Sequence, residues 1–198
     1  MDTSKAWRSV RQETSTMDRA LYNAVAETPT PYLDAGLRDL SRAANKSVLW
    51  SGIAAGLALA GGPRERRAAL TGMASVAAAS LLVNAGVKLV ARRARPARVT
   101  NADDRFVPMP ASTSFPSGHS ASAFAFAQGV ASVAPGTAIP LHIAAASVAY
   151  SRVHTGVHYP GDVVVGSLIG ILTGGLVGRL MNGPGSSQRV RPMMKSRR

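Results

Sequence analysis

Long stretches without a charged side chain constrain this chain more than any other feature of its sequence. No Lys, Arg, Asp or Glu occurs in residues 120–151, and the same holds for residues 48–59, 68–87 and 163–178. Charged residues gather instead near the chain ends and in the connections between these stretches. Because a charged side chain is costly in the hydrocarbon core of a bilayer, this distribution is typical of a membrane protein.

The charge-free stretches predict an all-α fold, a polytopic bundle of about five membrane-spanning helices. The predicted helices cover residues 48–62, 68–90, 120–134, 137–151 and 163–181. Several of them have about 15 residues, or about 22 Å at the helical rise, against a hydrocarbon core of roughly 30 Å. Buried helices of a soluble protein are therefore an alternative on length alone.

Glycine spacing in the last segment favours the bilayer over that alternative. Gly166, Gly170, Gly174 and Gly178 recur at every fourth residue and so lie on one stripe of a helix. A stripe of small residues allows helices to approach closely in lipid, where no hydrophobic effect drives their association.

The regions that flank the predicted bundle are polar. In residues 1–47, two sets of apolar residues recur at helical spacing: Met17, Leu21 and Val25, then Leu33, Leu37 and Leu40. They predict two amphipathic helices that lie at the membrane interface or cap the helix bundle, with a soluble helical arm as the alternative. No apolar run of signal-peptide length occurs there, so no secretory signal is expected. Residues 48–182 form the predicted membrane core, and residues 183–198 a disordered basic tail.

The chain is strongly basic, which indicates an anionic partner. It has 23 Lys and Arg against 10 Asp and Glu, a formal net charge of +13. A nucleic acid, a membrane surface or a phosphorylated small molecule would each fit that charge. The confinement of basic residues to helix ends and an aromatic content of 5% argue against a nucleic acid. The absence of cysteine excludes disulfides, thiol catalysis and Cys-ligated metal sites.

The first of three polar clusters follows the second apolar segment. Lys88 and Arg95 are seven residues apart and are expected on one helix face, with Arg92 on the same stripe. Pro96 disfavours a helical conformation of Arg95 and would let its guanidinium turn towards the helix mouth. Converging cations there would hold a group with two negative charges; an ordinary juxtamembrane basic cluster is the alternative.

The second cluster, Phe-Pro-Ser-Gly-His-Ser at residues 115–120, directly precedes the third apolar segment. Gly118 allows the backbone to approach a ligand, Ser117 offers a hydroxyl donor, and the helix start offers free N–H groups to an anion. His119 beside that anion could donate a proton to a leaving oxygen, although a lone histidine at a helix start is more often a cap.

The third cluster occupies residues 151–162, between the last two apolar segments. Arg152 can add a bidentate phosphate contact. His158 and Asp162 are four residues apart, and a carboxylate that accepts from one imidazole nitrogen leaves the other nitrogen free to attack phosphorus. His154 is interpreted as a loop residue.

Counting the predicted crossings places the three clusters on one side of the membrane. If residues 48–62 cross and residues 68–87 return, the first two clusters lie on the starting side. The next two crossings bring the third cluster back to that side. His142, near the opposite turn and without a charged neighbour, is interpreted as structural.

Together the clusters resemble the three signature motifs of the type-2 phosphatidic acid phosphatase superfamily. They occur in the same order as those motifs, as Lys88-x6-Arg95-Pro96, Pro116-Ser117-Gly118-His119 and Ser151-Arg152-x5-His158-x3-Asp162. The superfamily includes lipid phosphate phosphatases, soluble bacterial acid phosphatases and vanadium haloperoxidases, and the apolar helices agree with its membrane branch. The resemblance implies an enzyme that hydrolyses a phosphomonoester or a pyrophosphate on a membrane lipid.

The resemblance also implies a role for each motif residue. The phosphoryl oxygens would be held by Lys88, Arg95, Ser117, Gly118 and Arg152. His158 would attack phosphorus to form a phosphohistidine, Asp162 would orient it, and His119 would protonate the leaving alkoxide and then activate water. The family needs no metal and no cofactor for this chemistry, which is consistent with cations taking the place of a metal.

Several properties follow from the resemblance only in outline. The candidate substrates are phosphatidic acid, phosphatidylglycerol phosphate and polyprenyl-linked lipids, including decaprenylphosphoryl-5-phosphoribose. Membrane members commonly have six spanning helices, one more than predicted here. The family pattern favours a bacterial plasma membrane with the site outside the cytoplasm. The site side, however, has more Lys and Arg than the opposite side, and basic residues are enriched on the cytoplasmic side, which argues the reverse. The oligomeric state is open, and a non-catalytic protein that binds anionic lipid is the alternative of another class.

Overall fold

Proline sets several helix boundaries in the structure, a computed structural model that describes residues 3–98 and 105–183. Pro31, Pro63 and Pro160 each occupy the first turn of a helix, where the missing N–H removes no hydrogen bond. The elements are α1 (Thr3–Glu27), α2 (Pro31–Ala43), η1 (Asn45–Ser47), α3 (Val48–Ala60), α4 (Pro63–Leu81), the π-helical η2 (Leu82–Val87), α5 (Lys88–Val90), α6 (Gly118–Val133), η4 (Pro135–Thr137), α7 (Ala138–His154) and α8 (Pro160–Asn182). The five apolar segments coincide with α3, α4 to α5, α6, α7 and α8, which confirms the all-α prediction.

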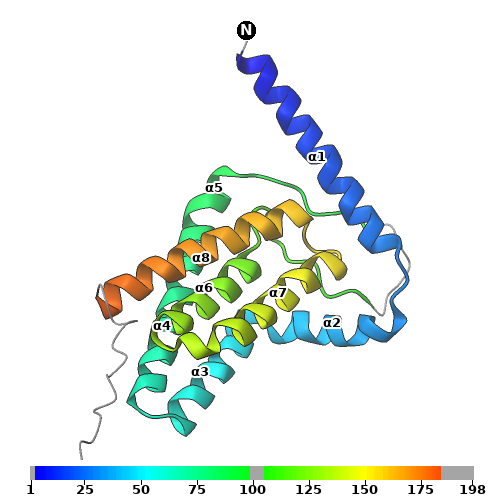
Figure 1. Cartoon of the computed structure of the whole chain (residues 1–198). Coiled ribbons are helices and arrows are strands. Elements are labelled where there is room, and N and C mark those ends of the chain that lie inside the picture. Colours follow the sequence, from blue (N-terminus) through cyan, green and yellow to red (C-terminus); the bar gives the residue numbers. More distant parts are fainter. Residues whose placement is uncertain (1–2, 99–104, 184–198) are drawn as a thin grey trace, which may run out of the picture.

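Helix α6 lies at the centre of the bundle and packs against α4, α7 and α8 (Figure 1). Four small side chains of α6 are fully buried: Ala121, Ala123, Ala125 and Ala127. Phe126 fills the wider space towards α3, where its ring centroid lies 5.3 Å from that of Trp50. The start of α6 is thereby fixed inside the bundle, and this positions the residues that precede it.

The glycine stripe of α8 allows a close contact with α6. All four stripe glycines are buried against α6. A Cβ atom on Gly166 would collide with the backbone of Ser117, and one on Gly170 would lie 2.9 Å from the Ala125 amide nitrogen. Real Cβ atoms do not approach other atoms under 3.0 Å, so these positions require glycine while α6 and α8 remain at this separation.

Replacing Gly170 with alanine is expected to destabilise the bundle by about 1–3 kcal/mol through overpacking, although alanine is the better helix former. For a chain of this size each kcal/mol corresponds to about 2–4 °C in Tm. Thermal unfolding of the detergent-solubilised protein measures this shift. The matched control is Gly175→Ala, because nothing lies within 4 Å of a Cβ atom there. Equal melting temperatures for the two variants would contradict the close α6–α8 packing.

The outer surface of the bundle is apolar, as expected for a membrane protein. Large exposed side chains of α8 include Val164, Leu168, Leu172, Leu176 and Leu180. Within the described residues, two helical stretches are long and apolar enough to cross a bilayer, Pro63–Val87 and Pro160–Asn182. Helices α3, α6 and α7, with 13, 16 and 17 residues, are shorter, so the number of five spans stays a prediction.

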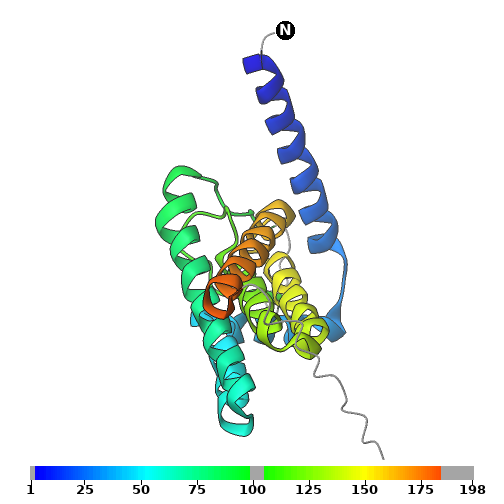
Figure 2. The same ribbon diagram turned by 60° about the vertical axis from the view of Figure 1, so that its left-hand side comes forward.

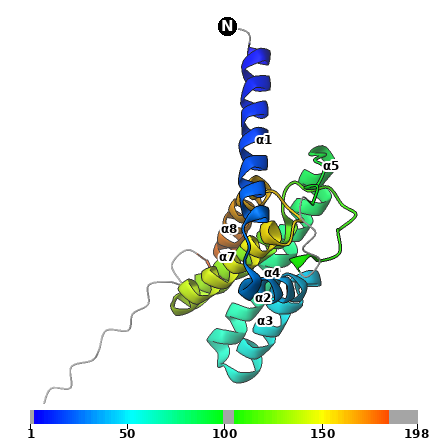
Figure 3. The same cartoon turned by 90° about the vertical axis from the view of Figure 1, so that its right-hand side faces the viewer.

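The two amphipathic segments form α1 and α2. Helix α2 packs against α7, whereas the N-terminal part of α1 projects beyond the bundle in every view (Figures 2 and 3). Arg105 ties the end of α1 to α2, because it donates to the carbonyls of Val25, Ala26 and Thr28 and pairs with Asp34 at 3.1 Å. Of the predicted basic tail, residues 184–198 lie outside the described residues.

Three arginines of the α3–α4 turn close the opposite end of the bundle. Arg64 donates to the Val133 carbonyl at the end of α6, Arg66 to the Ala58 carbonyl at the end of α3, and Arg67 to the Met181 carbonyl at the end of α8. The last carbonyls of a helix have no partner within it, so each arginine satisfies an acceptor that would otherwise face solvent or headgroups.

Candidate active site

The connection after α5, the start of α6 and the connection between α7 and α8 meet at one end of the bundle. Arg95 follows α5, and its Nη1 lies 3.3 Å from His158 Nε2 in the α7–α8 connection. The backbone N–H of Ser117, which caps α6, donates to the Asp162 carbonyl in the first turn of α8 at 2.9 Å. The structure therefore brings residues of all three polar clusters together.

His158 is almost completely buried. Its side chain is 2% exposed, and Nδ1 lies 3.6 Å from Asp162 Oδ2, longer than a hydrogen bond. Burial lowers the pKa of His158 to about 4, against the opposing effect of Asp162 and with the charges of Arg95 and Arg152 acting in the same direction as burial. The ring is therefore neutral near pH 7, and its Nε2 carries a lone pair on the side of Arg95.

Asp162 is held by three donors besides its approach to His158. Oδ1 accepts from Arg93 Nη1 at 2.8 Å, and Oδ2 accepts from the Ser114 hydroxyl and from the Tyr159 amide. The carboxylate is fully buried, so these hydrogen bonds replace the water that it loses. A fixed carboxylate at this position can set the orientation of the His158 ring.

Arg95 and Lys88 converge on the loop that contains Ser112. Arg95 donates to the Ser112 carbonyl and hydroxyl and to the carbonyls of Thr113 and Val157. Lys88 Nζ lies 3.3 Å from the Ser112 hydroxyl. Burial lowers the pKa of Lys88, and the positive charge of Arg95 lowers it further. A bound dianion would offset both effects, as expected of a phosphate site.

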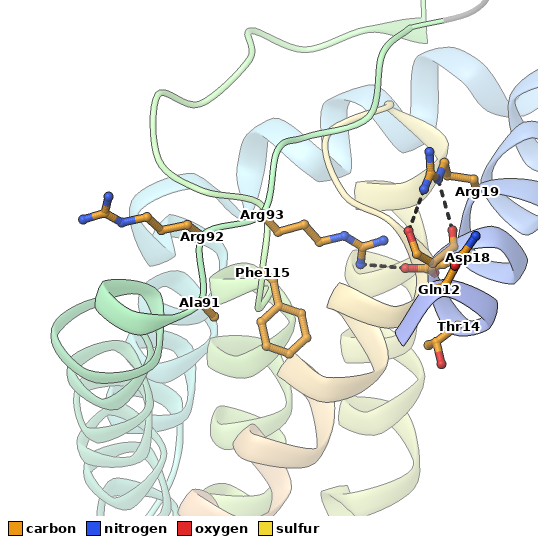
Figure 4. A pocket seen from close by; sticks show the side chains of 9 residues that line it. Gln12, Thr14, Asp18, Arg19, Ala91, Arg92, Arg93 and Phe115 are labelled. Carbon is orange, nitrogen blue, oxygen red and sulfur yellow. Dashed lines mark hydrogen bonds and ion pairs between the residues drawn. The ribbon is translucent and has the colours of Figure 1, made fainter. Parts of the chain in front are cut away.

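The predicted helical stripe of Lys88, Arg92 and Arg95 is wrong. The helix ends at Val90 because Ala91 leaves the helical region at φ −92° and ψ 88°, and residues 91–98 continue without regular secondary structure. Arg95 reaches the site from this segment rather than from a helix face. The Arg92 side chain points away from Arg93 and from α1 (Figure 4).

Ser117 and Gly118 form the entry to α6. Ser117 is fully buried and acts as the N-cap, where its hydroxyl accepts from the Ser120 amide and hydroxyl. Because it accepts in both contacts, its own proton remains available to a ligand. A Cβ atom on Gly118 would lie 3.8 Å from Val83 Cγ1 and 3.9 Å from Lys88 Nζ, so the glycine backbone lies close to this cation.

Arg152 is buried near the end of α7 and is 1% exposed. Its Nη1 donates to the carbonyl of Ser41 at 3.0 Å and to the Ser41 hydroxyl at 2.6 Å. Helix α2 thus fixes this guanidinium in the bundle, a role of Ser41 that no sequence pattern indicated. A buried arginine that has no carboxylate partner among the described residues is costly, and a bound anion would compensate for that cost.

His119 stands in the first turn of α6 beside the same cations. The charges of Arg152, Lys88 and Arg95 act on its ring, as does His158. Its Nε2 lies 2.9 Å from the side-chain oxygen of Asn45 in η1, another contact that the sequence did not indicate. Because the amide oxygen only accepts, this contact requires a proton on His119 Nε2.

Arg93 links the site to the N-terminal helix. Besides its hydrogen bond to Asp162, Arg93 Nη1 pairs with Asp18 of α1 at 2.6 Å (Figure 4), and its guanidinium lies 4.1 Å from the centre of the Tyr159 ring. Asp18 also accepts from the Gly161 amide at 2.7 Å. Sequence reasoning missed both residues, because Arg93 falls between the motif positions and Asp18 lies far away in the chain.

The two remaining histidines lie outside this cluster. His154 is not a loop residue as predicted: it ends α7, is buried, and its Nε2 lies 2.9 Å from Asp34 of α2. His142 lies near the start of α7, bonded to the Ala138 carbonyl at 2.8 Å and edge-on to Phe124. Its structural interpretation fits these contacts.

The helical bundle and its basic, histidine-containing end define a membrane phosphatase of lipid phosphates. Residues 69–184 match the PAP2 superfamily, and the chain belongs to this family, as its motifs predicted. Because the relatives of this chain are phosphatases, its place in the family argues for an enzyme and against a non-catalytic protein that binds anionic lipid.

Three relatives illustrate the family. The chain is 38% identical over 138 residues to the decaprenylphosphoryl-5-phosphoribose phosphatase of Mycolicibacterium smegmatis, a match that covers 66% of this chain and 69% of that protein. The structure resembles the transmembrane PAP2 type phosphatidylglycerolphosphate phosphatase from Bacillus subtilis, with a TM-score of 0.67 and 25% identity over 85% of this chain and 86% of that one. It also resembles Aquifex aeolicus LpxE, with a TM-score of 0.64 and 26% identity over 80% and 92% of the two chains.

Proposed function

We propose that this protein hydrolyses a phosphomonoester, or a pyrophosphate, on a membrane lipid through a phosphohistidine and without a metal ion. The observation that carries the proposal is the approach of His158 Nε2 to Arg95. His119 lies close enough to this pair to be affected by the charges of Arg95, Arg152 and Lys88. Two imidazoles at a cationic site provide a nucleophile and a proton donor for phosphoryl transfer.

The first step forms a covalent intermediate. His158 Nε2 attacks phosphorus while the bond from phosphorus to the lipid oxygen breaks. His119, held as an imidazolium by the negative charge of the bound phosphate, gives a proton to that oxygen. Charge on the phosphoryl oxygens is stabilised by Lys88, Arg95, Arg152, Ser117 and the Gly118 amide. Asp162 stabilises the positive charge that develops on the His158 ring, which requires the 3.6 Å separation to shorten to a hydrogen bond.

The second step regenerates the enzyme. His119, neutral after the first step, takes a proton from water as the water oxygen attacks phosphorus and the bond from nitrogen to phosphorus breaks. Inorganic phosphate leaves, His158 returns to the neutral state that its low pKa favours, and His119 again carries the proton. No electrons enter or leave in either step.

A polyprenyl-linked phosphosugar is the substrate class that we propose. It is supported by the 38% identity to a decaprenylphosphoryl-5-phosphoribose phosphatase. Phosphatidic acid or phosphatidylglycerol phosphate is the second candidate, favoured by the structural likeness to a phosphatidylglycerolphosphate phosphatase. These substrates differ in the alcohol that leaves when phosphate is transferred.

We also propose that the active site faces away from the cytoplasm. Support comes from the arginines of the α3–α4 turn, which lie at the end of the bundle opposite the site, since basic turns are enriched on the cytoplasmic side. Basic residues at the site end are weaker evidence for orientation, because Arg93, Arg95 and Arg152 bind groups inside the protein rather than the membrane surface.

The purified protein in detergent is expected to release phosphate from a lipid phosphate at the same rate with and without EDTA. In the described part of the chain, no group of three or more His, Asp or Glu side chains is placed to hold a metal ion. Colorimetric phosphate assay over a substrate panel measures both the activity and its substrate preference. Loss of activity in EDTA that a divalent cation restores would refute the mechanism.

A further inference from the structure

A small polar pocket opens beside His119. It has a volume of about 280 Å³ and lies between η1, the α4–η2 helix and the start of α6. Its polar lining, besides His119 and Lys88, comes from Lys46, Ser47, Ser80, Asn84, Ser112 and Ser122. We call it the leaving-group pocket, because the group that gives a proton to the departing oxygen stands in its wall.

The lining of this pocket suits hydroxyl groups and does not suit a hydrocarbon chain. The hydroxyls of Ser80 and Ser122 lie 3.1 Å apart, and either can donate, so the pair can offer a donor or an acceptor to a ligand. The Asn84 amide has no hydrogen-bond partner among the described residues. An acyl or prenyl chain placed here would leave these polar groups without water or a partner.

Lys46 adds an unpaired positive charge to the pocket. Its ammonium has no hydrogen-bond or ion-pair partner in residues 3–98 and 105–183. Lys46 and Ser47 have φ values of 51° and 60°, a left-handed conformation that is rare outside glycine. Such strained positions cluster at ligand sites, where the surrounding fold holds them. The strain is consistent with a backbone shaped to present Lys46 to an anion.

The volume of the leaving-group pocket limits the size of the group that it can bind. Pockets for drug-sized ligands span about 300–1,000 Å³, so a volume of about 280 Å³ fits a group comparable to a single sugar ring with one attached anionic group. A lipid tail must then leave the pocket towards the bilayer, where the exposed apolar side chains of α4 include Leu70 and Leu81.

We infer that the leaving-group pocket binds a hydroxylated, sugar-like alcohol that carries a second anionic phosphate group, with Lys46 as the contact for that group and Asn84 for a hydroxyl. This inference rests on the proposed function, because it assigns the pocket by the position of the departing oxygen. It makes Lys46 and Asn84 residues that determine substrate specificity.

The test compares two synthetic substrates, farnesylphosphoryl-ribose 5-phosphate and dioctanoyl phosphatidic acid, on the full-length protein in detergent. The quantity measured is the ratio of kcat/KM for the sugar substrate to kcat/KM for the glyceride. Lys46→Gly and Asn84→Ala are expected to lower this ratio, the lysine change by about tenfold or more because it removes a charge-assisted contact. Glycine adopts the left-handed conformation without strain, so this variant should fold.

Arg42→Ala is the matched control, because Arg42 is a nearby cation on α2 that pairs with Asp39 and does not line the pocket. It should keep the wild-type ratio. An unchanged ratio in both pocket variants, or the same change in the control, would overturn the inference while leaving the phosphatase activity in place. Absence of phosphate release from both substrates by the wild-type protein would refute the proposed function itself.

Discussion

His158→Ala is expected to lower kcat for lipid phosphate hydrolysis by about 10⁴-fold or more, because it removes the nucleophile of a two-step reaction. The remaining cations would still bind the substrate, so KM should change much less than kcat. Phosphate release measures the loss directly. Rapid acid-free quenching with ³²P-labelled substrate should also trap a labelled wild-type protein, with the label stable in base and lost in acid, as a phosphohistidine requires.

His142→Ala is the control for this experiment. His142 is bonded to the Ala138 carbonyl at the end of the bundle remote from the site, so its loss should leave both the rate and the labelling intact. Full activity of His158→Ala, or a label that persists in that variant, would exclude His158 as the nucleophile.

His119→Ala is expected to show an effect that depends on the leaving group. For an alkyl phosphate the loss in kcat should reach about 10²–10⁴-fold, the usual contribution of a general acid. For p-nitrophenyl phosphate the first step should be much less affected, because nitrophenolate leaves without a proton. The second step still lacks its base, so the phosphoenzyme should accumulate.

Stopped-flow absorbance measures this accumulation as a burst of nitrophenolate that equals the amount of enzyme. The burst should be larger in His119→Ala than in the wild-type protein, followed by a slower steady rate. Equal losses for both substrates without a burst would mean that His119 only binds the phosphoryl group or supports the fold through its contact with Asn45.

The helices were predictable because their physical causes are local. Absence of charge, helical spacing of apolar residues and breaks at Pro31, Pro63 and Pro160 are all present in the sequence. A close helix contact of α8 was also predictable, since glycine at every fourth residue leaves one stripe with no side chain, but the identity of its partner α6 was not. The number of spans was less predictable, because the length of a helix does not fix how a bundle sits in a bilayer.

The motif residues could be named from the sequence, but their surroundings could not. Arg93, Asp18, Ser41 and Asn45 contact site residues from positions that are distant in the chain or fall between motif positions. Such contacts depend on tertiary packing and leave no periodic signal. The same holds for the end of the helix at Val90, which the helical spacing of Lys88 and Arg95 had wrongly extended.

The arginine turn between α3 and α4 couples two properties that are usually independent. Its three guanidinium groups bind the terminal carbonyls of three different helices. Any substitution that removed this positive charge to invert the direction of membrane insertion would also fray those helix ends. If this turn faces the cytoplasm, as proposed above, the orientation of the protein in the membrane is tied to its folding.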